Sequence, residues 1–297
     1  MERVPLVAAV NDLSGFGRCS LTVALPILSA LGLQACPLPT AVLSNHTGYK
    51  SCWIEDFTDN LVPYIAQWRA LGLRFDGIYT GFLGNARQAE ILRGFLLEFA
   101  KPDAVRLVDP AMADNGRLYS SCSGELVEAM ARLVAESTVT TPNLTEACLL
   151  TRRDYAEVSA LRGSDALDAA FGMAEALRGL GAESAVVTGV HADDGFVDNV
   201  GADARGERFT VRTARIERSF AGTGDVFASV LFGRLVQGKA LRAAVADAAD
   251  FVHEATRLTA ESGSPLTDGI AFERLISPRF GAEGSFSDEH RAYQASP

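Results

Sequence analysis

The clearest chemical pattern in the sequence is the segment Gly222-Thr223-Gly224-Asp225, which leads into an amphipathic run over about 223–236. Its two glycines allow a tight turn whose backbone N–H groups point at one spot, and a helix N-terminus adds a positive partial charge there. The pattern predicts an anion hole for a phosphoryl group in transit. Asp225, in the first helical turn, would take the proton from a substrate hydroxyl as that oxygen attacks phosphorus. A plain glycine turn with a helix-capping carboxylate is the competing interpretation.

Two further segments place oxygen-bearing side chains after short apolar runs. Asp109-Pro110 follows one run, and Thr141-Pro142-Asn143-Leu144-Thr145-Glu146 follows the next. Hard divalent cations such as Mg²⁺ take oxygen ligands, keep several waters and bridge to substrate phosphates, so a few carboxylates suffice to hold one. The structural alternative is that Asn143 caps a helix and Glu146 completes a capping box, which is the commoner role for each residue taken singly.

A polar cluster, Ser44-Asn45-His46-Thr47-Gly48-Tyr49, follows the second main apolar run. A single His beside Asn and Thr is more often a residue with satisfied hydrogen bonds than a metal ligand or a base. The chain has only four histidines, which are far apart in the sequence. A metal site built from histidines is therefore not expected.

The elements that must position these groups alternate along the chain. Each polar segment follows a short apolar run, and stretches with helical periodicity separate the runs. Apolar runs that hardly alternate suit parallel strands covered by helices on both faces. The sequence therefore predicts a doubly wound α/β fold with a mainly parallel sheet, whose ligands bind beyond the carboxyl ends of the strands. We expect strands over 6–10, 35–43, 77–79, 105–108, 137–141 and 184–188, a hairpin over 195–211, and helices over 20–31, 56–71, 86–99, 223–236 and 240–261.

Length and composition narrow the remaining possibilities. The chain has 297 residues, 48% of them hydrophobic, and its formal net charge of −10 argues against partners such as nucleic acid or an anionic membrane. Five widely spaced cysteines argue against a disulfide framework or a zinc site. No apolar run approaches the roughly 20 residues that span a bilayer, and no signal-peptide pattern is present, so a cytoplasmic protein is expected. We expect one domain over 1–276 and a polar, mobile tail over 277–297.

Taken together, the motifs resemble those of the ribokinase-like superfamily and, within it, the pyridoxal (vitamin B6) kinases. The resemblance covers about 6–259 and includes Thr80-Gly81-Phe82. Only the Gly222 to Asp225 motif is shared widely across the superfamily, whereas the Ser44 to Thr47 segment is much more specific to the vitamin B6 kinases. The resemblance implies transfer of a phosphoryl group from ATP to the 5′-hydroxymethyl group of pyridoxal, pyridoxamine or pyridoxine. It also implies Mg²⁺, a monovalent cation such as K⁺, and a homodimer.

The resemblance also implies a role for each matched residue. Asp225 matches the catalytic base of the family. The remaining roles are an anion hole formed by Gly222, Thr223 and Gly224, substrate binding by Asp12, Ser14, Thr47, Phe82 and Tyr119, nucleotide binding by Asp114, Asn143 and Thr188, and coordination of cations near the ATP phosphates by Asp109, Thr141 and Glu146. Of these residues, Asp114 and Tyr119 fall in the segment that resembles the lid of the family.

One segment departs from the family pattern. Many pyridoxal kinases have Gln-Ser-His after the first strand, whereas this chain has Asn11-Asp12-Leu13-Ser14-Gly15. This segment is similar to the Ser-Asp-x-Ser-Gly start of the hydroxymethylpyrimidine kinases of thiamine synthesis. A fixed negative charge at Asp12 favours a cationic group through a charge-assisted hydrogen bond, so we expect preference to shift towards pyridoxamine or a protonated ring.

Other functions stay open as alternatives. A hydroxymethylpyrimidine kinase would use the same machinery on a related ring. A catalytically silent sensor of vitamer or nucleotide would have no physical need for a base at Asp225. Sugar kinases of this fold usually carry extra lid strands early in the chain, and residues 10–20 leave no room for them. A dehydrogenase is disfavoured because no G-x-G-x-x-G follows a strand.

Overall fold

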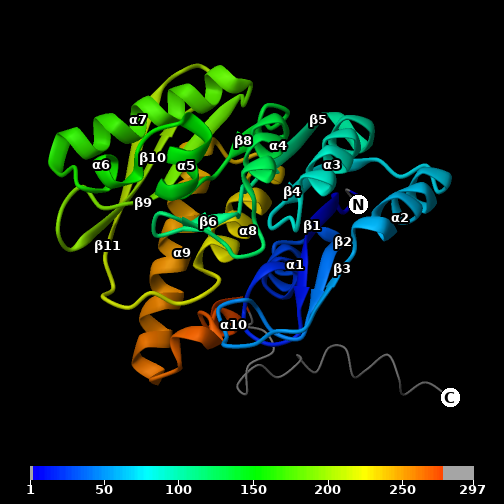
Figure 1. Cartoon of the computed structure of the whole chain (residues 1–297), viewed down its shortest axis with the longest axis horizontal. Helices are drawn as coiled ribbons and strands as arrows, with labels where there is room; N and C mark the ends of the chain where they lie inside the picture. Colours follow the sequence, from blue (N-terminus) through cyan, green and yellow to red (C-terminus); the bar gives the residue numbers. More distant parts are fainter. Residues whose placement is uncertain (1–2, 277–297) are drawn as a thin grey trace, which may run out of the picture.

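The structure, a computed structural model that describes residues 3–276, is organised around one sheet (Figure 1). Its strands are β1 (Leu6–Ser14), β2 (Gln34–Leu43), β3 (Ile54–Asp56), β4 (Phe75–Thr80), β5 (Ala100–Val108), β8 (Val139–Thr140), β9 (Ser184–Val190), β10 (Phe196–Ala202) and β11 (Arg208–Ala214). The spatial order is β11-β10-β9-β8-β5-β4-β1-β2-β3. The six strands from β9 to β2 pair in parallel, and antiparallel strands lie at the two edges. The tail expected over 277–297 lies outside the described residues.

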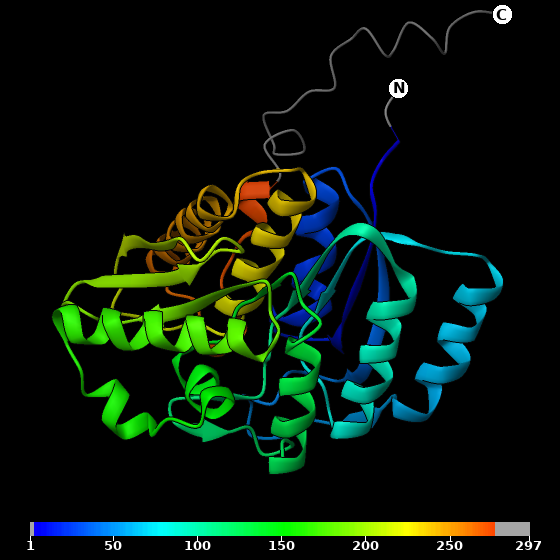
Figure 2. The ribbon, with the colours of Figure 1, turned by 90° about the horizontal axis from the view of Figure 1, so that it is seen from above.

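Helices cover both faces of this sheet, as Figure 2 shows. One face carries α1 (Ser20–Ala30), α8 (Thr223–Val236) and α9 (Leu241–Ser262), and the other carries α2 (Thr58–Ala70), α3 (Ala86–Phe99), α4 (Gly124–Val134), α5 (Leu144–Thr151) and α7 (Gly163–Leu180). Short helices α6 (Tyr155–Ser159) and α10 (Glu273–Ile276), the 3₁₀ turn η1 (Leu266–Asp268) and a separate small hairpin, β6 (Ala113–Asp114) with β7 (Arg117–Leu118), complete the described residues. The expected doubly wound α/β fold is confirmed.

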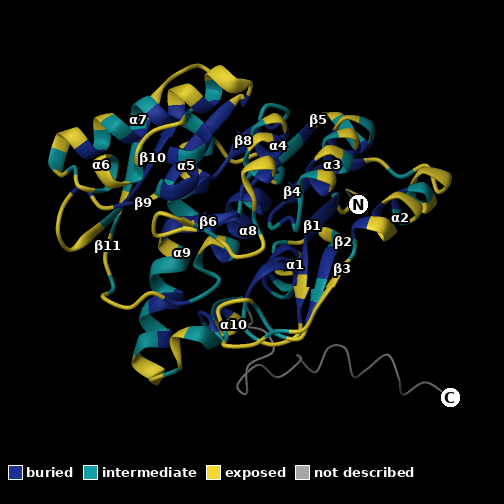
Figure 3. Ribbon diagram, in the orientation of Figure 1, coloured by how far each residue is buried: buried dark blue, intermediate teal, exposed yellow. Residues whose placement is uncertain are grey.

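The central strands are apolar on both sides because each side faces a helix layer. In β1, Val7 and Ala9 pack into the core under α1 and α8, whereas Ala8 and Val10 pack into the core on the opposite face, and all four are fully buried. Burial of both faces removes the need for a polar residue at every second position. The dark-blue sheet inside a mixed outer layer shows the same arrangement (Figure 3).

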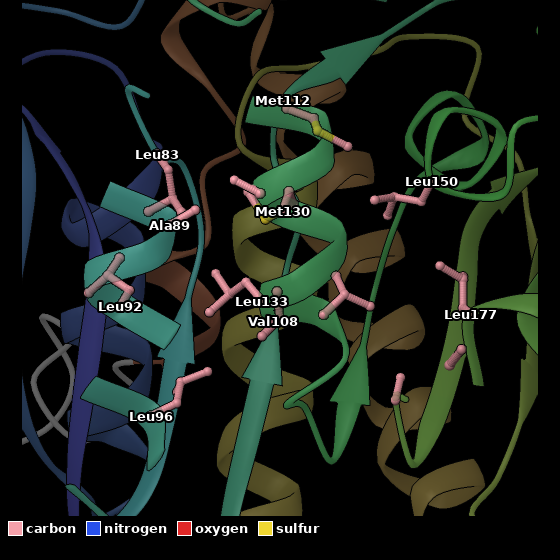
Figure 4. Packing of buried hydrophobic residues seen from close by; sticks show 14 of the residues in the cluster. Leu83, Ala89, Leu92, Leu96, Val108, Met112, Met130, Leu133, Leu150 and Leu177 are labelled. Atoms are coloured by element: carbon pink, nitrogen blue, oxygen red, sulfur yellow. The ribbon is translucent and has the colours of Figure 1, made fainter. Parts of the chain in front are cut away.

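Close packing of aliphatic side chains holds the helices on the sheet. Leu92 of α3 lies beside Met130 and Leu133 of α4, with Val108 of β5 beneath them (Figure 4). Each is fully buried, and full burial of such a side chain stabilises the fold by about 1.5–3 kcal/mol. This packing fixes the positions of the strand ends from which the polar segments project.

Strand register brings the polar segments together at one edge of the sheet. Val10 of β1 lies opposite Thr80 of β4, Thr80 lies opposite Val108 of β5, and Val108 lies opposite Thr140 of β8. The residues that follow these positions therefore share one edge, next to the N-termini of α5 and α8.

Among the described helices, none is long and apolar enough to cross a membrane. The five cysteines are free thiols, as expected.

Candidate active site

The glycine segment forms the open N-terminus of α8. Gly222 is the N-cap residue, with φ of 77°, and a Cβ there would lie 1.9 Å from the carbonyl oxygen of Arg18. Both the left-handed backbone and this close approach require glycine. No side chain of the described residues caps α8, so the N–H groups of its first turn remain available to an anion.

Asp225 stands in that first turn and is partly exposed. Desolvation raises the pKa of its carboxyl group to about 6, while hydrogen bonds from the backbone N–H of Ser20 and from Asn11 oppose the rise. The Nδ2 atom of Asn11 donates to Oδ1 of Asp225 at 3.3 Å. A carboxylate with this pKa is ionised at neutral pH and is still basic enough to accept a proton from a reacting hydroxyl.

Asp12 lies beside Asp225 but is itself buried. Its Oδ1 accepts a hydrogen bond from Oγ of Ser20 at 2.5 Å, and its Oδ2 accepts one from Oγ of Ser14 at 2.8 Å. Burial raises the pKa of Asp12, although both hydroxyl contacts lower it. Two predicted substrate-binding residues, Asp12 and Ser14, are thus only 4% and 0% exposed. They would therefore affect a substrate ring through their charge and position, not through a large contact surface.

Ser20 is a site residue that the motif analysis missed. Its φ is 51°, in the left-handed region that is unusual for a serine. The strained backbone directs its N–H to Asp225, and its hydroxyl bonds to Asp12. Ser20 therefore joins the two carboxylates at the start of α1. The only sequence feature that could have indicated this role is a serine at a predicted helix start, and such a serine is usually explained as a helix cap.

The second group of acids follows β5 and β8. Asp109 is 8% exposed, and burial together with the charge of Asp225 raises its pKa to about 8. Glu146 is 2% exposed, and burial together with the charge of Asp109 raises its pKa well above the usual range. The ion pairs found among the described residues include neither side chain. Two buried acids thus lie close together without a cationic side chain.

Glu146 also has the structural role that the sequence offered as an alternative. Its Oε2 accepts the N–H of Asn143 at 2.9 Å, and Oδ1 of Asn143 accepts the N–H of Glu146 at 3.0 Å, which makes a capping box. Its Oε1 accepts N–H groups of Met112 at 3.1 Å and Ala113 at 3.4 Å. The cap and the proposed cation-binding position are therefore two uses of one carboxylate.

The donor set around Asp109 suits a hard cation. The Oγ1 atom of Thr141 is buried beside Asp109, whose pKa it lowers, and makes no hydrogen bond of normal geometry, so this oxygen can also bind a cation. Residues 3–276 contain no cluster of three or more His, Cys, Asp or Glu side chains that could hold a metal ion by itself. Phosphate oxygens and waters would have to complete the coordination, as is usual for Mg²⁺ in phosphoryl-transfer sites.

The segment expected to form a lid is the β6–β7 hairpin and the residues after it. Nδ2 of Asn143 donates to the carbonyl oxygen of Ala113 at 2.8 Å, so the hairpin is tied to the start of α5. Asp114 is exposed at its turn, and Tyr119 follows β7 with 36% exposure. Desolvation by the groups around its hydroxyl, with the charges of Glu146 and Asp114, raises the pKa of Tyr119, which places this phenol near the acids.

The polar segment after β2 is anchored to η1. Nδ1 of His46 accepts the N–H of Gly48 at 3.1 Å, so Nε2 carries the proton and donates to the carbonyl oxygen of Thr267 at 2.7 Å. The hydroxyl of Tyr49 donates to Oδ1 of Asp268 at 2.9 Å. His46 is thus a structural residue with satisfied hydrogen bonds, as expected. Thr47, between these anchors, is exposed.

The turn η1 also contacts the glycine segment. The N–H of Ala221 donates to the carbonyl oxygen of Leu266 at 3.1 Å, the N–H of Ile270 donates to that of Ala221 at 3.2 Å, and the N–H of Arg18 donates to that of Asp268 at 3.2 Å. One turn therefore positions the loop carrying Thr47, the start of α1 and the entrance to α8. No motif in the sequence marked this turn.

The remaining expected contacts lie at neighbouring strand ends. Phe82 follows β4, is partly exposed, and donates its N–H to Oδ1 of Asn11 at 2.8 Å. Thr188 in β9 pairs in a β-bridge with Asn143 and donates its N–H to the carbonyl oxygen of Pro142 at 2.9 Å. The structure thus gathers the expected residues at one edge of the sheet. Their individual roles in binding stay predictions.

Comparison with known proteins agrees with this geometry. Residues 25–268 match the family model described as phosphomethylpyrimidine kinase. A protein of Bacteroides thetaiotaomicron assigned by name to the phosphomethylpyrimidine kinases, crystallised with pyridoxal, is 38% identical, with a TM-score of 0.85 over 92% of this chain and 95% of its own. Pyridoxal kinase from Lactobacillus plantarum is 28% identical, with a TM-score of 0.83 over 92% and 96%.

A curated relative from Bordetella avium points the same way. It is named pyridoxine/pyridoxal/pyridoxamine kinase, and it is 27% identical over 266 residues, which are 85% of each chain. The family model covers most of the sequence, and the similarity extends over both halves of the fold. The resemblance inferred from the motifs is confirmed, and the chain belongs to the phosphomethylpyrimidine kinase family within the ribokinase-like superfamily.

Proposed function

We propose that the protein is an ATP-dependent kinase that phosphorylates the 5′-hydroxymethyl group of pyridoxal, pyridoxamine or pyridoxine. The observation that carries this proposal is Asp225, partly exposed, with a pKa of about 6 and placed in the first turn of an uncapped helix. Transfer to an alcohol needs a base at the attacking oxygen and fixed positive dipoles at the phosphoryl group. The 38% identity to a pyridoxal-bound protein supports the substrate class.

Asp225 and the three residues before it have separate roles in the chemical step. Asp225 accepts the proton of the 5′-hydroxyl as its oxygen forms a bond to the γ-phosphorus of ATP. The bond between that phosphorus and the bridging oxygen of ADP breaks at the same time. Backbone N–H groups at Gly222, Thr223 and Gly224 stabilise negative charge on the phosphoryl oxygens, because they point at that position before the reaction begins.

We assign cation binding to Asp109, Thr141 and Glu146. Their buried oxygens, the raised pKa of both carboxyl groups and the buried hydroxyl of Thr141 beside Asp109 suit Mg²⁺, with a monovalent cation such as K⁺ nearby. Bound Mg²⁺ would neutralise charge on the ATP phosphates. Asn143, Thr188 and Asp114 are proposed to contact the nucleotide, and Thr47, Phe82 and Tyr119 the vitamer.

An assay of ADP release with ATP, Mg²⁺ and a panel of acceptors tests the function. The panel contains pyridoxal, pyridoxine, pyridoxamine and hydroxymethylpyrimidine, and Asp225→Asn is the matched control because its amide keeps the shape but cannot take the proton. We expect ADP release that depends on a B6 vitamer and is lost in the control. Binding of vitamers without turnover in the wild type would instead identify a sensor.

A hydroxymethylpyrimidine kinase is the second candidate. The description of the family model and the segment Asp12-Leu13-Ser14-Gly15 favour it. Higher kcat/KM for hydroxymethylpyrimidine than for every vitamer would establish this activity. Within the vitamer proposal, Asp12→Ser should reduce the preference for pyridoxamine over pyridoxal, because the buried charge near the ring is removed. Unchanged kcat/KM ratios would contradict that role for Asp12.

We also propose a homodimer formed along the β3 edge of the sheet. Trp53 and Ile54 are 60% and 47% exposed there, and β3 has no neighbour on its outer side within the described residues. A second copy would cover both features. Light scattering during gel filtration should give the dimer mass for the wild type and the monomer mass for Ile54→Lys. Leu97→Lys, at an exposed leucine of α3, is the control and should stay dimeric.

A further inference from the structure

Asn11 makes a side-chain contact with the proposed base from a distant part of the sequence. It lies on β1, is 1% exposed, and donates from Nδ2 to Oδ1 of Asp225 at 3.3 Å. Its own Oδ1 accepts two backbone hydrogen bonds, from the N–H of Phe82 at 2.8 Å and from the N–H of Asp12 at 3.0 Å. The amide thus connects β1, the end of β4 and the start of α8.

These contacts fix which way the amide of Asn11 points. Two backbone N–H groups face one end of the side chain, and only its oxygen can accept from them. Nδ2 must then face Asp225, where it is a donor to the carboxylate. A buried amide with both ends satisfied has a defined orientation, and its donor favours the ionised form of the acid it touches.

Gly81 provides the space for this amide. A Cβ at Gly81 would lie 2.3 Å from Nδ2 and 2.7 Å from Cγ of Asn11. The backbone just after β4 can therefore pass the amide closely only at a glycine. Gly81 is also bonded through its N–H to the carbonyl oxygen of Val10 at 2.9 Å, so the local backbone has little freedom to move aside.

We propose that Asn11 is a positioning residue that holds the carboxylate of Asp225 in the orientation required for proton transfer and couples it to the backbone at Phe82. The role in catalysis rests on the proposed kinase function, whereas the contact itself does not. Proton transfer needs the base within hydrogen-bond reach of the substrate hydroxyl, and a displaced or rotated carboxylate loses that geometry. Asn11 would therefore act on kcat rather than on nucleotide affinity.

Several titratable groups surround Asp225 and influence how far its pKa shifts when Asn11 is replaced. They come from each element packed around the base and are Asp12 on β1, Cys19 before α1, Tyr79 on β4, Asp109 after β5 and Tyr119 after β7. None is a permanently positive side chain. An additional carboxyl group at position 11 would therefore raise the pKa of Asp225 further.

The decisive variant is Asn11→Asp. It keeps an oxygen that accepts from Phe82 and Asp12, and it replaces the donor to Asp225 with a second acid. We expect kcat with pyridoxal at pH 7 to fall about tenfold or more, with the KM for ATP changed less than about twofold, since loss of a hydrogen bond to a charged group has an effect of this size. Loss of activity should be smaller at pH 9, where both carboxyl groups are ionised more fully.

A second readout needs no enzymatic turnover. In protein with ¹³C-labelled aspartate, the signal of Asp225 is identified by its absence in Asp225→Asn, and its titration gives the pKa of the free protein. We expect this pKa to rise in Asn11→Asp. A normal kcat together with an unshifted titration of Asp225 would overturn the proposal. If the wild-type protein phosphorylates no vitamer but Asn11→Asp still raises the pKa of Asp225, the proposed function is refuted and the contact is established.

Two further variants keep the test valid if Asn11→Asp does not fold. Gly81→Ala displaces the amide without changing its chemistry and should lower kcat in the same way. Combined with Asn11→Ala it should add no further loss, because the amide is then absent; additive losses would overturn the proposal. Asn199→Asp places a carboxyl group at another buried asparagine, on β10 near the opposite end of the sheet, and should leave kcat unchanged.

Discussion

Asp225 and the pair formed by Asp109 and Glu146 lie at one edge of the sheet, but the pKa values of their carboxyl groups differ. Asp225 receives hydrogen bonds from Asn11 and from the backbone of Ser20, and its pKa is about 6. Asp109 and Glu146 are more buried; burial and the charge of Asp225 raise the pKa of Asp109 to about 8, and burial and the charge of Asp109 raise the pKa of Glu146. The first carboxylate is ionised at neutral pH by contacts within the chain, whereas the second pair is not.

The difference indicates which part of the site is complete in the free protein. A base must be ionised before substrate arrives, so its donors come from the fold itself. A pair that holds a cation gains its compensating charge only with that cation, and its acids can stay protonated until then.

Removing the base should have the largest effect. In Asp225→Ala, kcat should fall by about 10²–10⁴, because no other group is placed to take the hydroxyl proton. Affinity for ADP should stay near that of the wild type, since the anion hole is made of backbone N–H groups. Steady-state kinetics and calorimetric titration with ADP measure both quantities. Near-normal turnover would mean that Asp225 is not the base.

A methyl group at the anion hole should have the next largest effect. Gly222→Ala has to relieve a positive φ and a Cβ placed 1.9 Å from the carbonyl oxygen of Arg18. We expect kcat to fall about 100-fold, as when a fixed donor is lost, and the melting temperature to fall as well. Gly224→Ala is the structural control, because a Cβ there meets no atom within 4 Å, and its melting temperature should be unchanged. Equal melting temperatures for both variants would contradict the steric argument.

The pair of buried acids should control the cation requirement. In Glu146→Gln, the Mg²⁺ concentration for half-maximal activity should rise about tenfold, because one anionic oxygen is lost. The amide oxygen of the new side chain can still accept from the N–H of Asn143, but its NH₂ group then faces the N–H groups of Met112 and Ala113, so the melting temperature without Mg²⁺ should fall by a few degrees. Titration of activity with Mg²⁺ at fixed ATP measures the effect. An unchanged Mg²⁺ dependence would show that Glu146 serves only as a helix cap.

The smallest effect concerns stability and pH. Asp109 has a pKa of about 8 in the fold and about 4 in an unfolded chain, so the native state binds more protons between these values. Stability without Mg²⁺ should therefore fall as pH rises from about 4 to about 8. Asp109→Asn should remove part of this dependence and raise the melting temperature at pH 8 by a few degrees. Thermal melts at pH 5 and pH 8 test it, and a lower melting temperature for the variant at pH 8 would contradict the sign.

Much of the fold was predictable because its elements leave local signals. The helix from Ala86 to Phe99 has the expected bounds, and the hairpin of β10 and β11 lies where the turn residues placed it. The short strands β3 and β6 were missed, since two or three residues show no periodicity. β5 begins at Ala100, earlier than expected, because Lys101, Pro102 and Asp103 are at least partly exposed and break the apolar pattern of the strand.

Local sequence patterns predicted the alternation of the main strands and helices, the glycine segment with Asp225 and the acids after β5 and β8, because burial, turns and helix starts each depend on neighbouring residues. Three features became visible only in the folded chain: Asn11 and Ser20 hold Asp225, Asp109 and Glu146 share one buried space, and η1 positions the loop carrying Thr47. Asn11 and Asp225 are separated by 214 positions. Contacts over such distances depend on strand register and on the packing of whole helices, which no local pattern records.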